Sequence, residues 1–140
     1  MPALVLDASV AISWCFPGDP TEDTPYSRKI LSSLATLDAV VPEVWAFEIA
    51  NTLFVSCAKR KRIDEEQIAE YLDLLKSLPI RVEPAGLWQN VGLESLAREW
   101  DLSAYDAAYL ALARRQRLPL ATADERLRKA ALSLGVEVFL

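Results

Sequence analysis

The sequence contains no histidine, and this absence excludes several kinds of catalytic site. Without histidine there is no Ser-His-Asp or Cys-His arrangement, no imidazole acid–base chemistry and no zinc site with a histidine ligand. Only two cysteines are present, Cys15 and Cys57, and they form no CxxC motif. A thiolate zinc site is therefore not expected either, and any catalysis must depend on carboxylates, hydroxyls, amines or a hard metal ion.

Long apolar runs are also absent. No stretch reaches the roughly 18 residues needed to span a bilayer, and the apolar N-terminus lacks a basic leader and includes Asp7. We therefore expect neither a transmembrane helix nor a signal peptide. The two isolated cysteines are typical of buried free thiols in a reducing compartment, so a cytoplasmic location is expected.

The composition is that of an ordinary globular domain. The chain has 140 residues, of which 52% are hydrophobic and 25% charged. No repeat, linker or low-complexity tract interrupts it, so residues 1–140 are predicted to form a single domain.

Short apolar segments alternate with longer segments of helical periodicity. Strands are expected at residues 3–6, 39–41, 80–83, 118–121 and 136–139. Helices are expected at residues 7–16, 25–37, 43–61, 64–78, 87–100, 103–117 and 124–134. This alternation predicts an α/β fold, a three-layer α/β/α sandwich around a central, mainly parallel sheet of about five short strands. In such sheets ligands bind beyond the carboxyl ends of the strands.

Three aspartates stand at the beginnings of predicted helices. Asp7 and Asp124 each follow a predicted strand, and Asp106 follows Ser103 by three residues. Each has a local alternative, because an acid at these positions can cap a helix or interact with its dipole. Taken one at a time, the three aspartates do not indicate a site.

Glu48 is harder to explain as a local feature. It is the only charged residue between Val44 and Ala58. Its helical neighbours three and four residues away include no cation, so no local ion pair stabilises it. A carboxylate on a largely buried helix must pair, bind a metal or become protonated; the alternative is a solvent-facing or neutral Glu48.

Together the four acids indicate a metal site. A parallel sheet can bring the ends of the two strands that precede Asp7 and Asp124 side by side, with Glu48 and Asp106 projecting from helices toward the same edge. Carboxylates within about 4–6 Å of one another repel unless a cation compensates. Ligands that are all oxygen select Mg²⁺ or Mn²⁺. The predicted metal and catalytic residues are therefore Asp7, Glu48, Asp106 and Asp124.

The segments around these acids resemble a known family. They are Leu6-Asp7-Ala-Ser9, Phe47-Glu48-Ile-Ala-Asn51, Ser103-Ala-Tyr-Asp106-Ala-Ala-Tyr-Leu-Ala-Leu-Ala113 and Ala121-Thr-Ala-Asp124. Their order and spacing, over essentially the whole chain, are similar to those of PIN-domain nucleases, and most of all to the VapC toxins of toxin–antitoxin pairs.

The resemblance implies Mg²⁺- or Mn²⁺-dependent cleavage of RNA with the four matching acids as the metal site. It also implies a homodimer inhibited by a cognate, VapB-like antitoxin. Two alternatives stay open: a PIN-domain nuclease of RNA processing without an antitoxin, and a non-catalytic binding module on the same fold. Residues expected to hold the acids in place are Ser9, Asn51, Ser103 and Thr122, although local capping explains the serines and the threonine nearly as well.

RNA binding requires positive charge, whereas the chain has a net charge of −5. Ten of the fifteen basic residues, however, fall into three clusters, at residues 59–62, 114–117 and 126–129. Because the acids repel RNA, basic residues must hold its backbone. The candidates are Arg114, Arg115, Lys59 and Arg60, with ordinary solvated faces as the alternative.

Overall fold

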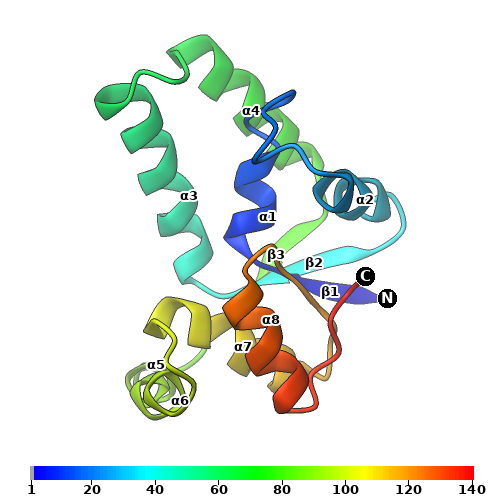
Figure 1. The fold of residues 1–140 in the computed structure, drawn as a ribbon, viewed down its shortest axis with the longest axis vertical. Helices are drawn as coiled ribbons and strands as arrows, with labels where there is room; N and C mark the ends of the chain where they lie inside the picture. The colour runs from blue at the N-terminus through cyan, green and yellow to red at the C-terminus, as the bar shows by residue number, and fades with distance from the viewer. Residues whose placement is uncertain (1) are drawn as a thin grey trace.

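Four short parallel strands form the centre of the computed structural model, which describes residues 2–140 (Figure 1). The strands are β1 (Ala3–Leu6), β2 (Asp38–Val41), β3 (Ile80–Val82) and β4 (Leu120–Ala121), in the order β3-β2-β1-β4. All four positions agree with the sequence prediction, and the α/β class is confirmed.

Helices connect and cover the strands. They are α1 (Ala8–Ser13), α2 (Pro25–Ser33), α3 (Val44–Phe54) with the π-helix η1 (Val55–Lys59), α4 (Glu65–Ser77), α5 (Leu87–Val91), α6 (Leu93–Trp100), α7 (Ala104–Gln116) and α8 (Glu125–Ser133). Two of their N-termini are closed by reciprocal capping boxes, Thr24 with Ser27 at α2 and Asp64 with Gln67 at α4. Pro25 at the first position of α2 lacks the N–H that the helix would leave unpaired.

The predicted fifth strand was wrong as a full strand. Within the described residues, Val138 forms only an isolated parallel bridge with Leu120. Two hydrogen bonds make this contact, from Leu120 N to Glu137 O and from Phe139 N to Leu120 O. Because β4 is only two residues long, the pairing does not extend beyond this bridge.

Two predicted helices are not continuous. The helix expected at residues 43–61 is α-helical only to Phe54 and ends in η1. The helix expected at residues 87–100 is divided at Gly92 into α5 and α6. Glycine is a poor residue for a helix interior because its backbone loses the most conformational freedom on folding.

The connectivity creates a reversal beside β1. The chain runs from β1 to β2 to β3 in one direction and then crosses back to β4 on the other side of β1. In Figure 1, α1 to α4 lie on one side of the sheet and α5 to α8 on the other, as right-handed crossovers require. The loops after β1 and β4 therefore diverge, which leaves space for a site between their carboxyl ends.

The core is packed where the two helix layers meet the sheet. The largest side chains with less than 2% exposure are Tyr109, Leu4, Leu6, Ile30, Leu110, Leu112, Leu120, Leu127, Val5, Val10, Val40 and Val41. β1 is buried along its whole length, as expected for a central parallel strand. Among residues 2–140, no helix has both the length and the apolar character of a membrane span.

Candidate functional site

Asp7 and Asp124 lie at the reversal of the sheet order. Leu6 pairs with Ala121 in the register of β1 and β4, and the Asp7 N–H donates to Ala121 O across 3.0 Å. Asp7 thus follows β1 directly, and Asp124 comes three residues after the end of β4. Sheet pairing brings two acids together that are 117 positions apart in the chain.

Asp7 is buried, with 3% of its surface exposed. Its Oδ2 accepts hydrogen bonds from the hydroxyls of Ser9, at 2.7 Å, and Thr122, at 2.6 Å. Asp7 occupies the N-cap position of α1 but makes no side-chain capping bond there. Burial raises the pKa of Asp7, the two hydroxyls lower it, and the charge of Asp124 raises it further. Capping therefore does not explain this residue.

Asp124, by contrast, is a true helix cap. Its Oδ1 accepts from the N–H groups of Arg126, at 2.8 Å, and Leu127, at 3.1 Å, at the start of α8. These hydrogen bonds occupy one carboxylate oxygen and leave Oδ2 without a hydrogen bond among residues 2–140. The capping alternative and the site prediction are thus compatible for this residue.

Asp106 lies in the first turn of α7 and is partly buried. Its N–H donates to Ser103 Oγ, at 3.0 Å, while its carboxylate makes no hydrogen bond or ion pair in the described part of the chain. Burial raises the pKa of Asp106, and so do the charges of Asp7 and Asp124. The Ser103 side chain and the charge of Arg126 lower the pKa of this carboxyl, which faces the other acids.

Glu48 completes the group from the opposite layer. It lies on α3 and is partly buried, and its Oε1 accepts a hydrogen bond of 2.7 Å from the hydroxyl of Tyr109 on α7. Burial raises the pKa of Glu48, the Tyr109 bond lowers it, and the charges of Asp7 and Asp106 raise it. The four acids are thus close enough for their charges to shift one another's pKa values, as expected if they lie at one edge of the sheet.

The donor set fits a hard divalent cation. Every candidate ligand is a carboxylate oxygen, and among residues 2–140 none of the four acids is in an ion pair with lysine or arginine. Among residues 2–140, no group of three or more acidic or cysteine side chains has a geometry that could hold a metal ion. Such an open arrangement is compatible with Mg²⁺, which keeps several waters and binds only one or two carboxylates directly.

Three of the four expected supporting residues adjoin the acids. Thr122 Oγ1 donates to Asp7 and accepts from Asp124 N at 3.0 Å, and Ser9 Oγ also accepts from Ala123 N at 3.2 Å. Ser103 Oγ accepts the N–H of Asp106, and the Ser103 side chain also lowers the pKa of that carboxyl. Asn51 is exposed and makes no hydrogen bond to the four acids within residues 2–140, so its role stays a prediction.

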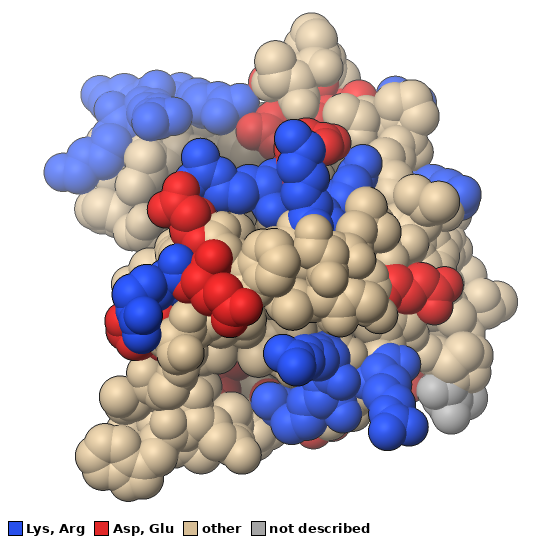
Figure 2. Space-filling view, turned by 60° about the horizontal axis from the view of Figure 1, so that its bottom comes forward, with Lys and Arg blue, Asp and Glu red and all other residues tan. Residues whose placement is uncertain are grey.

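The candidate RNA-binding residues lie at the ends of long helices. Arg114 and Arg115 are exposed near the C-terminus of α7, about 12–14 Å along the helix from Asp106. Lys59 and Arg60 are exposed after α3, about 16–18 Å from Glu48. Figure 2 shows lysine and arginine side chains in separate groups, with acidic side chains between some of them, and not as one continuous basic surface.

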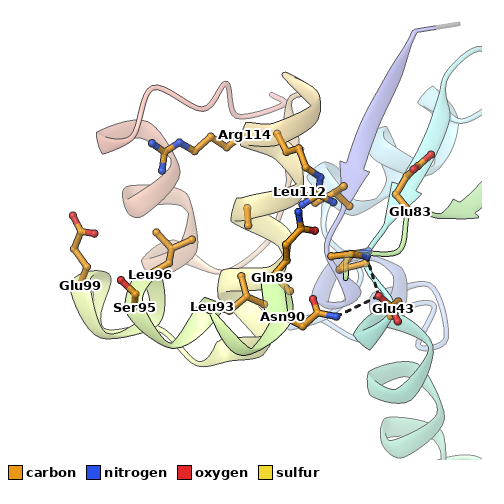
Figure 3. Close-up of a pocket in the computed structure, with 16 residues that line it drawn as sticks. Glu43, Glu83, Gln89, Asn90, Leu93, Ser95, Leu96, Glu99, Leu112 and Arg114 are labelled. Atoms are coloured by element: carbon orange, nitrogen blue, oxygen red, sulfur yellow. Dashed lines mark hydrogen bonds between the residues drawn. The ribbon is translucent and has the colours of Figure 1, made fainter. Parts of the chain in front are cut away.

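A pocket of about 430 Å³ lies beside the acids but contains none of the four. Figure 3 shows it between the α5–α6 pair, α7 and the ends of β2 and β3, with Glu43, Glu83 and Glu99 on its walls. Glu43 accepts hydrogen bonds there from Ala85 N, at 3.0 Å, and Asn90 Nδ2, at 3.4 Å. Arg114 and Arg115 line the same pocket, so both cations have acidic residues nearby.

Tyr109 is the residue that sequence reasoning did not assign to the site. Its position was informative, because it follows Asp106 by three residues on one helix and so shares a face with it. A tyrosine within an alanine- and leucine-rich helix is also expected to bury its ring, and a buried hydroxyl needs a hydrogen-bond partner. That this partner is Glu48, however, depends on how α3 and α7 pack.

Comparisons with known proteins agree with the fold. The PIN domain family model matches residues 4–132. The fold is similar to that of PAE2754 from Pyrobaculum aerophilum, at 22% identity and a TM-score of 0.66 over 92% of this chain and 86% of that chain. It is also similar to VapC20 of Mycobacterium tuberculosis, a sarcin-ricin loop cleaving toxin, at 19% identity and a TM-score of 0.63 over 91% of this chain and 95% of that chain. No curated protein matches significantly.

Proposed function

Since the chain belongs to the PIN-domain family, we propose that it is a Mg²⁺- or Mn²⁺-dependent endoribonuclease and the VapC-type toxin of a type II toxin–antitoxin pair. The observation that carries this proposal is the group of four carboxylates at the β1–β4 edge. Three of them, Asp7, Glu48 and Asp106, have a pKa raised by burial and by neighbouring acids. The site thus has the charge and the donor type that a hard cation requires.

Asp7 and Asp106 would hold the cation, with Glu48 and Asp124 binding it directly or through water. When bound, such an ion lowers the pKa of a coordinated water and stabilises negative charge on a phosphate. Ser9 and Thr122 keep Asp7 Oδ2 in place and leave Oδ1 for binding. The reaction is hydrolysis of an RNA phosphodiester bond by external water, so the products carry a 5′-phosphate and a 3′-hydroxyl.

The RNA backbone would be held by the exposed cations at the two helix ends, Arg114 and Arg115 on α7 and Lys59 and Arg60 after α3. They lie at least two helical turns along α7 or α3 and η1 from the acids. This separation supports contacts to flanking phosphates, because positive charge there offsets the repulsion between RNA and the acidic centre.

The remaining proposals concern partners and location. The similarity to VapC20 in fold supports a cognate VapB-like antitoxin as protein partner, and the family resemblance supports a homodimer. A cytoplasmic location is supported by Cys15 and Cys57, which are both free thiols.

Nuclease activity is tested by incubating purified chain with a defined RNA in Mg²⁺, Mn²⁺ or EDTA. Wild type is expected to cleave only with the metals, and Asp7→Asn to be inactive. Asp73→Asn is the matched control. It makes the same carboxylate-to-amide change at an exposed position on α4 and is expected to retain full activity. Equal cleavage by wild type and Asp7→Asn would falsify the site, and 2′,3′-cyclic phosphate ends would contradict attack by external water.

The toxin role is tested separately by expressing the chain in a bacterial host. Expression of wild type is expected to arrest growth, and co-expression of the short reading frame beside its gene to restore growth. Normal growth with a chain that cleaves RNA in vitro would instead identify an RNA-processing nuclease without an antitoxin.

A further inference from the structure

Tyr109 connects the two helix layers at the acidic edge. Its side chain is fully buried, and its hydroxyl donates to Glu48 Oε1 across 2.7 Å. The two residues are 61 positions apart, on α7 and α3. The same helix α7 carries Asp106 one turn earlier, so α7 provides one acid of the site and also the group that holds another.

The Tyr109 bond is the only side-chain hydrogen bond of Glu48 among residues 2–140. No lysine or arginine of the described chain forms an ion pair with this carboxylate, and the charges of Asp7 and Asp106 act against it. Without the hydroxyl, the Glu48 side chain would be free to rotate away from these acids toward solvent. The position of Glu48 in the site thus depends on one donor.

The phenol is well suited to this task. A tyrosine hydroxyl has an ordinary pKa of about 10, so it stays protonated and can donate throughout the physiological pH range. It occupies Oε1 and leaves Oε2 available. Asp7 and Asp124 resemble Glu48 in this respect. In each of them one carboxylate oxygen accepts hydrogen bonds, and the other accepts none among residues 2–140.

We propose that Tyr109 is a positioning residue of the site, whose hydroxyl orients Glu48 so that its second oxygen faces the cation and its water shell. The inference rests on the proposed metal-dependent function. Residues that orient metal ligands through hydrogen bonds typically change metal affinity by about 10–100-fold when they are removed. Loss of the Tyr109 hydroxyl is expected to fall in this range.

The chain offers a matched control for this test. Tyr71 on α4 is also buried, with 4% exposure, and its hydroxyl donates to the backbone carbonyl of Ala11 and not to an acid. Tyr109→Phe and Tyr71→Phe each remove one oxygen atom from a buried phenol. Both variants therefore lose one hydrogen bond from a buried tyrosine hydroxyl, but only the first loses a bond to an acid of the site.

The experiment is a calorimetric titration of Mn²⁺ into wild type, Tyr109→Phe and Tyr71→Phe, with the fold of each checked by circular dichroism. The dissociation constant is expected to rise at least about 10-fold for Tyr109→Phe and to stay unchanged for Tyr71→Phe. In RNA cleavage, the Mn²⁺ concentration for half-maximal rate is expected to rise by the same factor. An unchanged dissociation constant for Tyr109→Phe overturns the inference and leaves the proposed function intact.

A second measurement keeps the test decisive if Tyr109→Phe does not fold. The wild-type chain is labelled with 3-fluorotyrosine, which retains the hydroxyl, at position 109 or at position 71 and is titrated with Mg²⁺ under fluorine NMR. The resonance at position 109 is expected to shift and that at position 71 to stay. No shift at position 109 at saturating Mg²⁺ overturns the inference, whereas absence of any metal binding by wild type overturns the metal site itself.

Discussion

Thr122 donates its hydroxyl hydrogen to Asp7 Oδ2 across 2.6 Å. The same hydroxyl oxygen accepts the N–H of Asp124 at 3.0 Å. Thr122 is fully buried and Asp7 is 3% exposed, so the Asp7 carboxylate has no water to replace this hydroxyl. The Thr122 side chain, directly after β4, therefore positions two acids. Asp7 follows β1 and Asp124 follows β4, the two strands beside which the sheet order reverses.

Removing this hydroxyl is expected to weaken both the fold and the site. Thr122→Val keeps the shape of the side chain but leaves Asp124 N without its partner and Asp7 with only Ser9. We expect the free energy of unfolding to fall by about 1–3 kcal/mol, the cost of unpaired buried polar groups, together with a loss of ribonuclease activity. Urea unfolding measures the first effect, and Thr122→Ser, which retains the hydroxyl, should stay within about 1 kcal/mol of wild type. Equal stability of the valine variant and wild type would contradict this account.

Asp7→Asn is expected to stabilise the chain in EDTA while abolishing cleavage. An asparagine Oδ1 in the place of Asp7 Oδ2 still accepts from Ser9 and Thr122, but the buried negative charge is gone. Buried charges kept for function commonly lower the stability of a fold. The free energy of unfolding of Asp7→Asn should therefore exceed that of wild type by about 1–2 kcal/mol, or roughly 5 °C in Tm. Differential scanning calorimetry in EDTA gives the comparison, and a lower Tm for Asp7→Asn would oppose the idea that its charge is a cost to the fold.

The metal-free chain is expected to lose stability as the pH rises above the ordinary carboxyl range, near 4. Burial and neighbouring acids raise the pKa of Asp7, Glu48 and Asp106 in the folded state. Over the interval between the unfolded and folded pKa, the folded chain binds more protons than the unfolded chain. Stability therefore decreases with pH across that interval and levels off above the folded pKa.

The measurement is the free energy of unfolding in EDTA from pH 5 to pH 8, for wild type and Asp7→Asn. The wild-type curve should fall more steeply than that of the variant. Asp19, Asp23 and Glu94, whose pKa values are lowered by hydrogen bonds, affect stability only below the ordinary range and do not mask the trend. Parallel curves for the two proteins would show that Asp7 titrates alike in the folded and unfolded states.

The α7 arginines are expected to determine part of the salt dependence of RNA binding. If Arg114 and Arg115 each contact a phosphate, then changing both to glutamine should reduce the slope of log affinity against log salt by about 1.4. Filter binding of RNA to the Asp7→Asn background avoids cleavage during the assay. Lys29→Gln with Lys76→Gln removes the same charge from exposed positions on α2 and α4 and serves as control. If the slope equals that of the control pair, the two α7 arginines do not contact RNA phosphates.

The placement of the acids illustrates how far local patterns extend. Strand–acid junctions at Asp7 and Asp124 and the uncompensated charge of Glu48 predicted where they would meet, because parallel strands end at one edge. The same local view gave every aspartate a capping alternative and could not tell them apart. Asp124 caps α8, whereas Asp7 occupies a cap position without making the bond. The Asp7 carboxylate instead accepts the hydroxyls of Ser9, in α1, and Thr122, directly after β4.

By itself, the sequence determined the α/β class and the order of strands and helices along the chain, because hydrophobic periodicity is a property of the chain alone. The absence of histidine allowed it to predict the chemistry of the site. Tertiary structure decided the rest. The bridge at Val138, the break at Gly92 and the bond from Tyr109 to Glu48 depend on contacts between segments distant along the chain. Their energies are set by burial and packing, which no short window of sequence contains.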